Sequence, residues 1–285
     1  MKMQTAPAIP DSVTKINSIF SYCILLETAP ALPEGITSMD GVFFHCEALV
    51  TAPEIPEGVT SMENTFYGTA LTVAPQLPAT VTNLEKTFAY CESLVEAPEI
   101  SDGVTNMNGT FQSCEALVTA PEIPASVTDM SYTFAHCYSL EAAPNIPASV
   151  TDMSFTFEYC KSLKVAPMIP EGVTDMSGTF DGCEALETVP VIPSSVTRMT
   201  FAFYRCFALT GVIEINATLE DYNDCGGTEC STCKSGKACI ECVHCANYMY
   251  CFSGTKQPIV LTGSCDKLEE LAATADADYE NVTVA

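Results

Sequence analysis

The chain has 285 residues, of which 47% are hydrophobic and 16% charged, a composition that fits a continuous packed core and excludes a disordered chain. Its formal net charge of −25, from 36 acidic and 11 basic residues, disfavours a nucleic-acid partner because a phosphate backbone would be repelled. No apolar run approaches about 18 residues, so we expect no membrane-spanning segment.

A phenylalanine recurs every 23 residues over most of the chain, and a common frame of residues surrounds each copy. Only the interval from Phe66 to Phe88 is one residue shorter. A fixed period of this length predicts a solenoid, and we expect residues 6–210 to form nine stacked coils with Leu, Ile, Val, Met, Phe and Cys inward. The repeated positions are Phe20, Phe43, Phe66, Phe88, Phe111, Phe134, Phe157, Phe180 and Phe203.

The start of the chain shows neither an export signal nor a polar capping unit ahead of Ala6. We therefore expect a fragment of a longer protein, or an end that a partner covers.

Each repeat divides into two halves. The first, such as Leu49–Pro56, predicts a short parallel strand, and its Ala-Pro pair removes a backbone donor and so weakens the ladder. The second half opens with Ser, Asn or Asp, residue types that cap helices, and it predicts one helical or 3₁₀ turn as far as the cysteine. The capping slot holds Ser38, Ser61, Asn83, Asn106, Asp129, Asp152 and Asp175.

Eight repeats place a cysteine three residues after the phenylalanine. Redox or metal chemistry is one interpretation, but the slot lies between two strictly apolar ones, and free cysteine is among the most buried residue types. We expect reduced core thiols at Cys23, Cys46, Cys91, Cys114, Cys137, Cys160, Cys183 and Cys206.

The recurring pattern C-x-x-L, a short strand ending in Ile-Pro, V-T, an apolar residue and F-x-x-C resembles the BspA-like leucine-rich repeat. This 23-residue class occurs in bacterial and protist cell-surface proteins, with related units in phage-encoded proteins. The resemblance covers residues 6–210; Met replaces the usual Ile before the phenylalanine, and the Ala-Pro pair is an addition. It implies a leucine-rich-repeat fold and a role in attachment or adhesion, and it brings no catalytic residues.

In a leucine-rich repeat the strands line the concave side, so the outward strand positions are the expected ligand face. The slot after Ala-Pro varies while its neighbours do not, which indicates either a binding row or ordinary solvation. Its central members, our ligand-face candidates, are Glu54, Gln76, Glu99, Glu122 and Asn145.

An aromatic row follows two residues after the phenylalanine, and it predicts either a contact ladder or packing between coils. Its members are Tyr22, His45, Tyr90, His136 and Tyr159. A third row, Asp129, Asp152 and Asp175, suits either calcium or the capping of turns.

Residues 211–285 depart from the frame and predict a C-terminal α/β capping unit. We expect strands at Val212–Ile215, Pro258–Gly263 and Val282–Val284, and a helix over Asp266–Ala275 with its apolar residues on one face.

A cysteine-dense insertion, residues 225–251, has almost no aliphatic content, so covalent or metal staples are needed to order it. Four disulfides, zinc and free thiols all remain open. The surface-protein resemblance favours disulfides, whereas the missing signal and the unpaired core thiols favour zinc. The candidates are Cys225, Cys230, Cys233, Cys239, Cys242, Cys245, Cys251 and Cys265.

The sequence contains no Ser/His/Asp set, no phosphate loop and no compact acid–base pair, so we expect no enzyme and no cofactor apart from the zinc just considered. The hypothesis is a non-enzymatic binding or adhesion protein, extracellular or on the cell surface, that presents its solenoid to a protein or cell-surface ligand. One alternative is a structural subunit of a virion appendage or filament that assembles by end-to-end stacking. The other is a zinc-stabilised interaction module in the cysteine-rich insertion.

Overall fold

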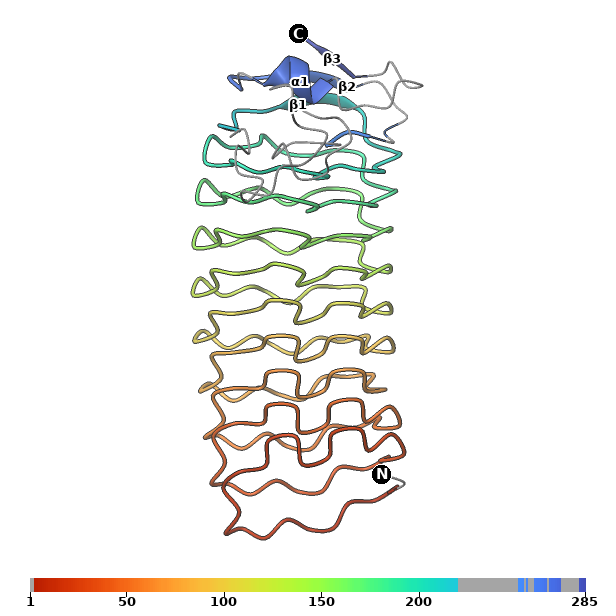
Figure 1. The fold of residues 1–285 in the computed structure, drawn as a ribbon, viewed down its shortest axis with the longest axis vertical. Coiled ribbons are helices and arrows are strands. Elements are labelled where there is room, and N and C mark those ends of the chain that lie inside the picture. Colours follow the sequence, from red (N-terminus) through yellow and green to blue (C-terminus); the bar gives the residue numbers. More distant parts are fainter. Residues whose placement is uncertain (1–2, 220–250, 254, 256–258, 266, 273–281) are drawn as a thin grey trace, which may run out of the picture.

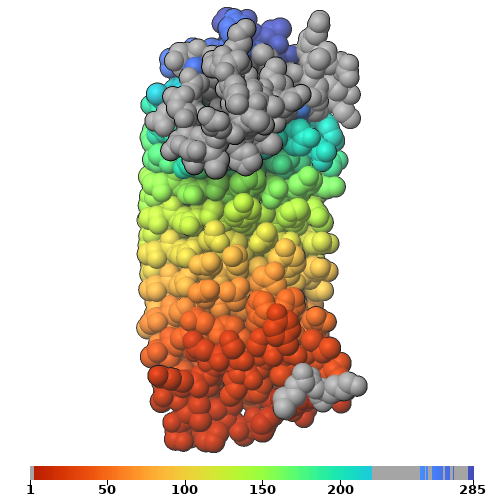
Figure 2. Space-filling model, viewed as in Figure 1, coloured from red at the N-terminus to blue at the C-terminus, as the bar shows by residue number. Residues whose placement is uncertain are grey.

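The computed structural model describes residues 3–219, 251–253, 255, 259–265, 267–272 and 282–285. Successive turns of the chain stack along one axis, and the two ends lie at opposite ends of the stack (Figure 1 and Figure 2). The described part of residues 3–210 forms nine coils, and the predicted inward residues fill the interior. In the third coil, for example, Val59, Met62 and Phe66 have no exposed surface.

The phenylalanines form one continuous ladder through the core. Neighbouring ring centroids lie 5.6 to 5.7 Å apart from Phe20 to Phe203, with the rings nearly parallel. Phe252 adds a tenth described ring, 5.4 Å from Phe203. The ladder therefore continues beyond residue 210, where the sequence suggested that the frame ends; the division into residues 6–210 and 211–285 remains a prediction.

The predicted helical turn is wrong, because the second half of each coil contains no helix in residues 3–219. It is a series of overlapping four-residue turns, as in Val42 N–H to Met39 O (3.0 Å) and Cys46 N–H to Phe43 O (3.0 Å). The intervening N–H groups bond to the next coil instead, as in Phe43 N–H to Thr65 O (2.9 Å). An α-helix would use all these N–H groups in hydrogen bonds within the helix, and none of them would then connect one coil to the next.

This alternation depends on positive φ at two positions in every coil. One is the residue two places before the phenylalanine, and the other is the residue two places after it. All thirteen described non-glycine residues with positive φ occupy these two positions, among them Tyr22, His45 and Tyr159. Such backbone is uncommon outside glycine, yet here it recurs in every coil. It is therefore part of the architecture and does not mark a special site.

The predicted capping residues do bond to a nearby backbone N–H, but in turns and not at helix ends. Asp129 Oδ1 accepts from Ser131 N–H at 2.8 Å, and Asp152 and Asp175 repeat this arrangement. Asp and Asn side chains stabilise turns in this way. The same slot carries the parallel bridges that join each coil to the next from Ser38 to Arg198.

The first half of each coil is extended, with the weak pairing that its prolines predict. Only isolated parallel bridges connect it, such as Thr28 with Thr51 and Val165 with Thr188. No segment of residues 3–210 is paired over enough length to form a regular strand.

The regular elements lie in the C-terminal unit at the places that the sequence predicts. Strands β1 (Gly211–Glu214), β2 (Ile259–Thr262) and β3 (Val282–Val284) form a parallel sheet in that order, and helix α1 spans Leu268–Ala272. Ile215 pairs with Ile192 of the ninth coil, and Arg205 N–H bonds to Ser253 O at 2.9 Å. The unit thus continues the ladder of the solenoid.

Candidate binding face

A groove lies on the outer side of the extended halves of the second, third and fourth coils. Its volume is about 710 Å³. We call this side, formed by the successive Ala-Pro-x-Ile/Leu-Pro segments, the Ala-Pro face. The lining residues fall at equivalent positions in three consecutive segments, within residues 29–34, 52–57 and 75–78.

The local sequence explains the shape of this groove. Each segment contributes proline rings to the lining, two of the three also contribute small alanines, and Leu32, Ile55 and Leu77 pack their inner sides on the core. The last proline of each segment begins a tight turn, as in Val59 N–H to Pro56 O at 3.1 Å. Because proline fixes φ and its ring is rigid, the walls lose little freedom when a ligand binds.

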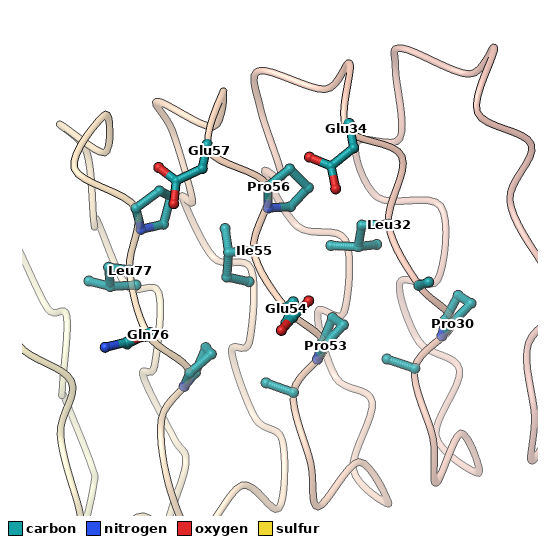
Figure 3. A pocket seen from close by; sticks show the side chains of 15 residues that line it. Pro30, Leu32, Glu34, Pro53, Glu54, Ile55, Pro56, Glu57, Gln76 and Leu77 are labelled. Atoms are coloured by element: carbon teal, nitrogen blue, oxygen red, sulfur yellow. The ribbon is translucent and has the colours of Figure 1, made fainter.

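Two parallel rows of polar side chains flank an apolar row in the groove (Figure 3). Glu34 and Glu57 lie on one side of Leu32, Ile55 and Leu77. Glu54 and Gln76 lie on the other side. A bound segment would therefore meet apolar surface in the middle and carboxylates along both edges.

The structure brings two of the five ligand-face candidates together and leaves three outside. Glu54 and Gln76 line the groove, while Glu99, Glu122 and Asn145 continue the same exposed row over the next three coils. Glu34 and Glu57 were missed by the sequence analysis. The signal was their shared place directly after the Ile/Leu-Pro pair, a position to which the sequence analysis assigned no role.

The charge around this face is one-sided. Between residues 16 and 160 the sequence has eighteen acidic residues and one basic residue, Lys86. Lys86 lies in the second half of its coil, and its Nζ is 3.8 Å from Glu85 Oε1. None of the lining residues of the groove is basic. The face therefore carries a negative potential that attracts cationic groups.

The aromatic row packs between coils, which was the second of its two predicted roles. Tyr22 stacks on His45 with centroids 5.3 Å apart, and His136 stacks on Tyr159 at 5.0 Å. Tyr90 contacts Tyr67, a residue the sequence analysis missed because it lies one position away from the row. Stacking covers part of the surface of these rings, although Tyr22 is still 58% exposed.

An acidic pair lies beside this row in the seventh and eighth coils. Burial raises the pKa of Glu158 to about 7, with a contribution from the Asp181 carboxylate, and burial raises the pKa of Asp181 to about 6. His136 Nε2 is 3.7 Å from Glu158 Oε2, and desolvation lowers the pKa of His136. The positive charge of Lys161 also lowers the pKa of His136. The positive charge of Arg205 opposes the rise in the pKa of Asp181.

This pair contributes stability that is lost as the pH rises from about 5 to 8. The folded chain holds the Glu158 proton more tightly than an unfolded chain, so its stability falls as the pH passes from the unfolded pKa to the folded pKa of about 7. Glu158→Gln should be more stable than the parent at pH 8 by roughly 1 to 3 kcal/mol, and equal to it near pH 4. Chemical denaturation at several pH values measures this. The exposed Glu141→Gln is the control, and an equal effect of both substitutions at pH 8 would refute the prediction.

The core cysteines are buried, reduced thiols, as predicted. Each Sγ from the second member onward donates to the phenylalanine carbonyl of the preceding coil, as in Cys137 Sγ to Phe111 O at 3.2 Å. Burial raises the pKa of Cys46 to about 12 and that of Cys91 to about 11, so these thiols stay protonated and unreactive. Thr69 fills the missing position in the short repeat and lies 3.3 Å from Cys91 Sγ.

Two of the eight disulfide candidates, Cys251 and Cys265, lie within the described residues, and both are buried; the disulfide pairing of this region stays a prediction. Cys251 O accepts the Phe203 N–H and Cys265 N–H bonds to Ile215 O, so both residues belong to the packed end of the ladder. The other six candidates and the predicted zinc site lie outside the described residues. Within the described ranges, no group of three metal-ligating side chains occurs, and the Asp129–Asp152–Asp175 row is used in turns.

The comparisons with known proteins agree with this architecture. The sequence model of the BspA type leucine rich repeat region matches residues 4–95, 84–210 and 153–272. These matches cover most of the chain, which therefore belongs to the BspA-type leucine-rich repeat family. No curated protein matches the chain.

Among solved structures, the chain is similar to a leucine-rich repeat protein from Bacteroides ovatus ATCC 8483, with 20% identity and a TM-score of 0.66 over 94% of this chain and 64% of that one. A leucine rich cell surface protein from Faecalibacterium prausnitzii A2-165 is 29% identical, with a TM-score of 0.46 over 71% of this chain and 62% of that one. The first likeness confirms the fold. The chain spans less than two thirds of the length of either protein. Its described residues contain no helix long and apolar enough to cross a membrane.

Proposed function

We propose that this member of the BspA-type leucine-rich repeat family is a non-enzymatic, cell-surface binding protein that holds a protein partner on its Ala-Pro face. Family membership supports the general role, since such repeats serve as scaffolds for protein interaction at surfaces. The observation that carries the proposal is the groove of about 710 Å³ that three consecutive segments of this face line.

Three further features favour this face over the rest of the surface. Its segments hold few hydrogen bonds to one another, so their polar groups remain available to a partner. Its prolines and the phenylalanine ladder beneath it keep it rigid, which lowers the entropy cost of association. The aromatic side, by contrast, already uses part of its ring surface in packing between coils.

Blocking the groove tests the proposal. The full chain is immobilised and exposed to a panel of purified extracellular-matrix and cell-envelope proteins, and the affinity for each binder is measured. Ala31→Trp and Gln76→Trp should fill the groove and lower the affinity at least about tenfold, the loss typical of a substitution at the centre of an interface. The control, Glu92→Trp, places the same bulk on an exposed turn in the other half of its coil.

Thermal unfolding of each variant shows that the fold is kept. Equal affinity of the groove-filled variants and the parent would contradict the proposal, as would a failure of the parent to bind any protein of the panel.

A further inference from the structure

The composition of the groove is informative about its ligand. Eleven of its fifteen lining residues are Ala, Pro, Leu or Ile, and three of the other four are Glu34, Glu54 and Glu57. All three carboxylates are exposed, and Lys or Arg is absent from the lining. The apolar floor of the groove favours small aliphatic side chains in a ligand, and the carboxylates along its rims favour positively charged ones.

The direction of the groove limits the shape of the ligand. Its walls come from equivalent residues in successive coils, so the groove runs along the solenoid axis. Adjacent coils pair at the strand spacing of about 4.8 Å, so three coils span roughly 10 Å, the length of about three residues of extended chain. A narrow, linear segment fits this space better than a folded surface does.

The backbone on this face also limits the mode of binding. Pro30, Pro53, Pro56, Pro75 and Pro78 have no N–H to offer. A ligand cannot add a regular strand across such positions. Recognition must then come from side-chain packing on the prolines and from charge.

We propose that the groove binds an extended, positively charged segment of the partner protein, with small apolar side chains between the prolines and Lys or Arg side chains reaching Glu34, Glu54 and Glu57. This inference rests on the proposed function and specifies the chemistry of the partner. A second copy of this chain is disfavoured as the occupant because its own surface between residues 16 and 160 carries the same acidic excess.

Three labelled nine-residue peptides test the inference with the full chain. They consist of repeated Lys-Ala-Pro, Gln-Ala-Pro or Glu-Ala-Pro, so that only the charge changes, and fluorescence anisotropy measures their affinities. The Lys peptide should bind, the Gln peptide at least about fivefold more weakly, and the Glu peptide more weakly still. Raising the salt from about 20 to 200 mM should weaken the Lys peptide most, because salt screens exposed charges.

Variants locate the site. Glu54→Gln and Glu57→Gln should each weaken the Lys peptide about two- to fivefold, in line with exposed ion pairs. The control is Glu141→Gln, which removes the same charge from an exposed residue outside the groove and should leave the affinity unchanged.

Two results would overturn the inference. One is equal binding of the Gln and Lys peptides, and the other is an equal loss in Glu141→Gln, which would indicate general attraction to an acidic protein. These failures are separable from failure of the proposed function. A panel protein that Ala31→Trp releases, but that the Lys peptide does not displace, would leave the binding face intact and refute only its cationic ligand.

Discussion

Phe134→Ala should lower the free energy of unfolding by about 3 to 5 kcal/mol, the usual cost of removing a large buried ring. Phe134 is fully buried and stacks on both Phe111 and Phe157 at 5.7 Å, so the substitution removes two ring contacts and leaves a cavity in the centre of the ladder. Urea unfolding monitored by circular dichroism measures the change.

Val118→Ala is the matched control, because Val118 lies in the same coil as Phe134 but is 40% exposed. Its stability should change by less than about 0.5 kcal/mol. If Phe134→Ala were as mild as Val118→Ala, the rings would not form the core of one continuous solenoid.

Gly263→Ala should destabilise the C-terminal unit by about 2 to 5 kcal/mol, from backbone strain and overpacking together. Gly263 follows β2 with φ +118°, a conformation that other residues rarely adopt, and an added Cβ would overlap the carbonyl group of Ile215. That carbonyl accepts the Cys265 N–H at 3.1 Å, and Ile215 N–H bonds to Thr262 O at 2.7 Å. The clash therefore falls on the junction between the last coil and β2.

Gly211→Ala is the control, since Gly211 also has positive φ (+90°) but open space around it. It should cost only about 1 to 2 kcal/mol. Hydrogen exchange at the Ile213 and Leu261 amides should speed up much more in Gly263→Ala than in Gly211→Ala, and equal exchange in the two variants would contradict this view of the junction.

The solenoid itself follows from the sequence because one period constrains every coil at once. Inward positions such as Val127, Met130 and Phe134 recur at fixed spacing, and only stacked copies bury them all. The strands and the helix of the C-terminal unit were also predictable, since each has an apolar pattern of its own.

The turns were mispredicted because two structures share one local signal. Asp129 followed by Met130 and Ser131 suits a helix cap and an Asp-stabilised turn equally well, and the choice between them depends on bonds to the next coil. Residues such as Tyr132 and His136 have positive φ, but nothing about their side chains indicates this backbone conformation in the sequence. Phe252 was missed because the cysteine-rich insertion separates it from the frame.

The candidate site was predictable in part for a similar reason. The exposed slot of Glu54 and Gln76 is visible as a variable position among fixed ones. The groove itself cannot be seen in the sequence, since it depends on how the prolines and small alanines of three consecutive coils lie next to one another. Glu34 and Glu57 acquire their role only through that alignment.

A structure of the full chain in complex with a bound panel protein tests the central claim most directly, because it locates the partner on the solenoid. We predict an extended segment of the partner lying along the axis between the Glu34–Glu57 row and the Glu54–Gln76 row, in contact with Ile55. A partner seated on the aromatic row at Tyr22 and His45, with the groove left open, would contradict the account.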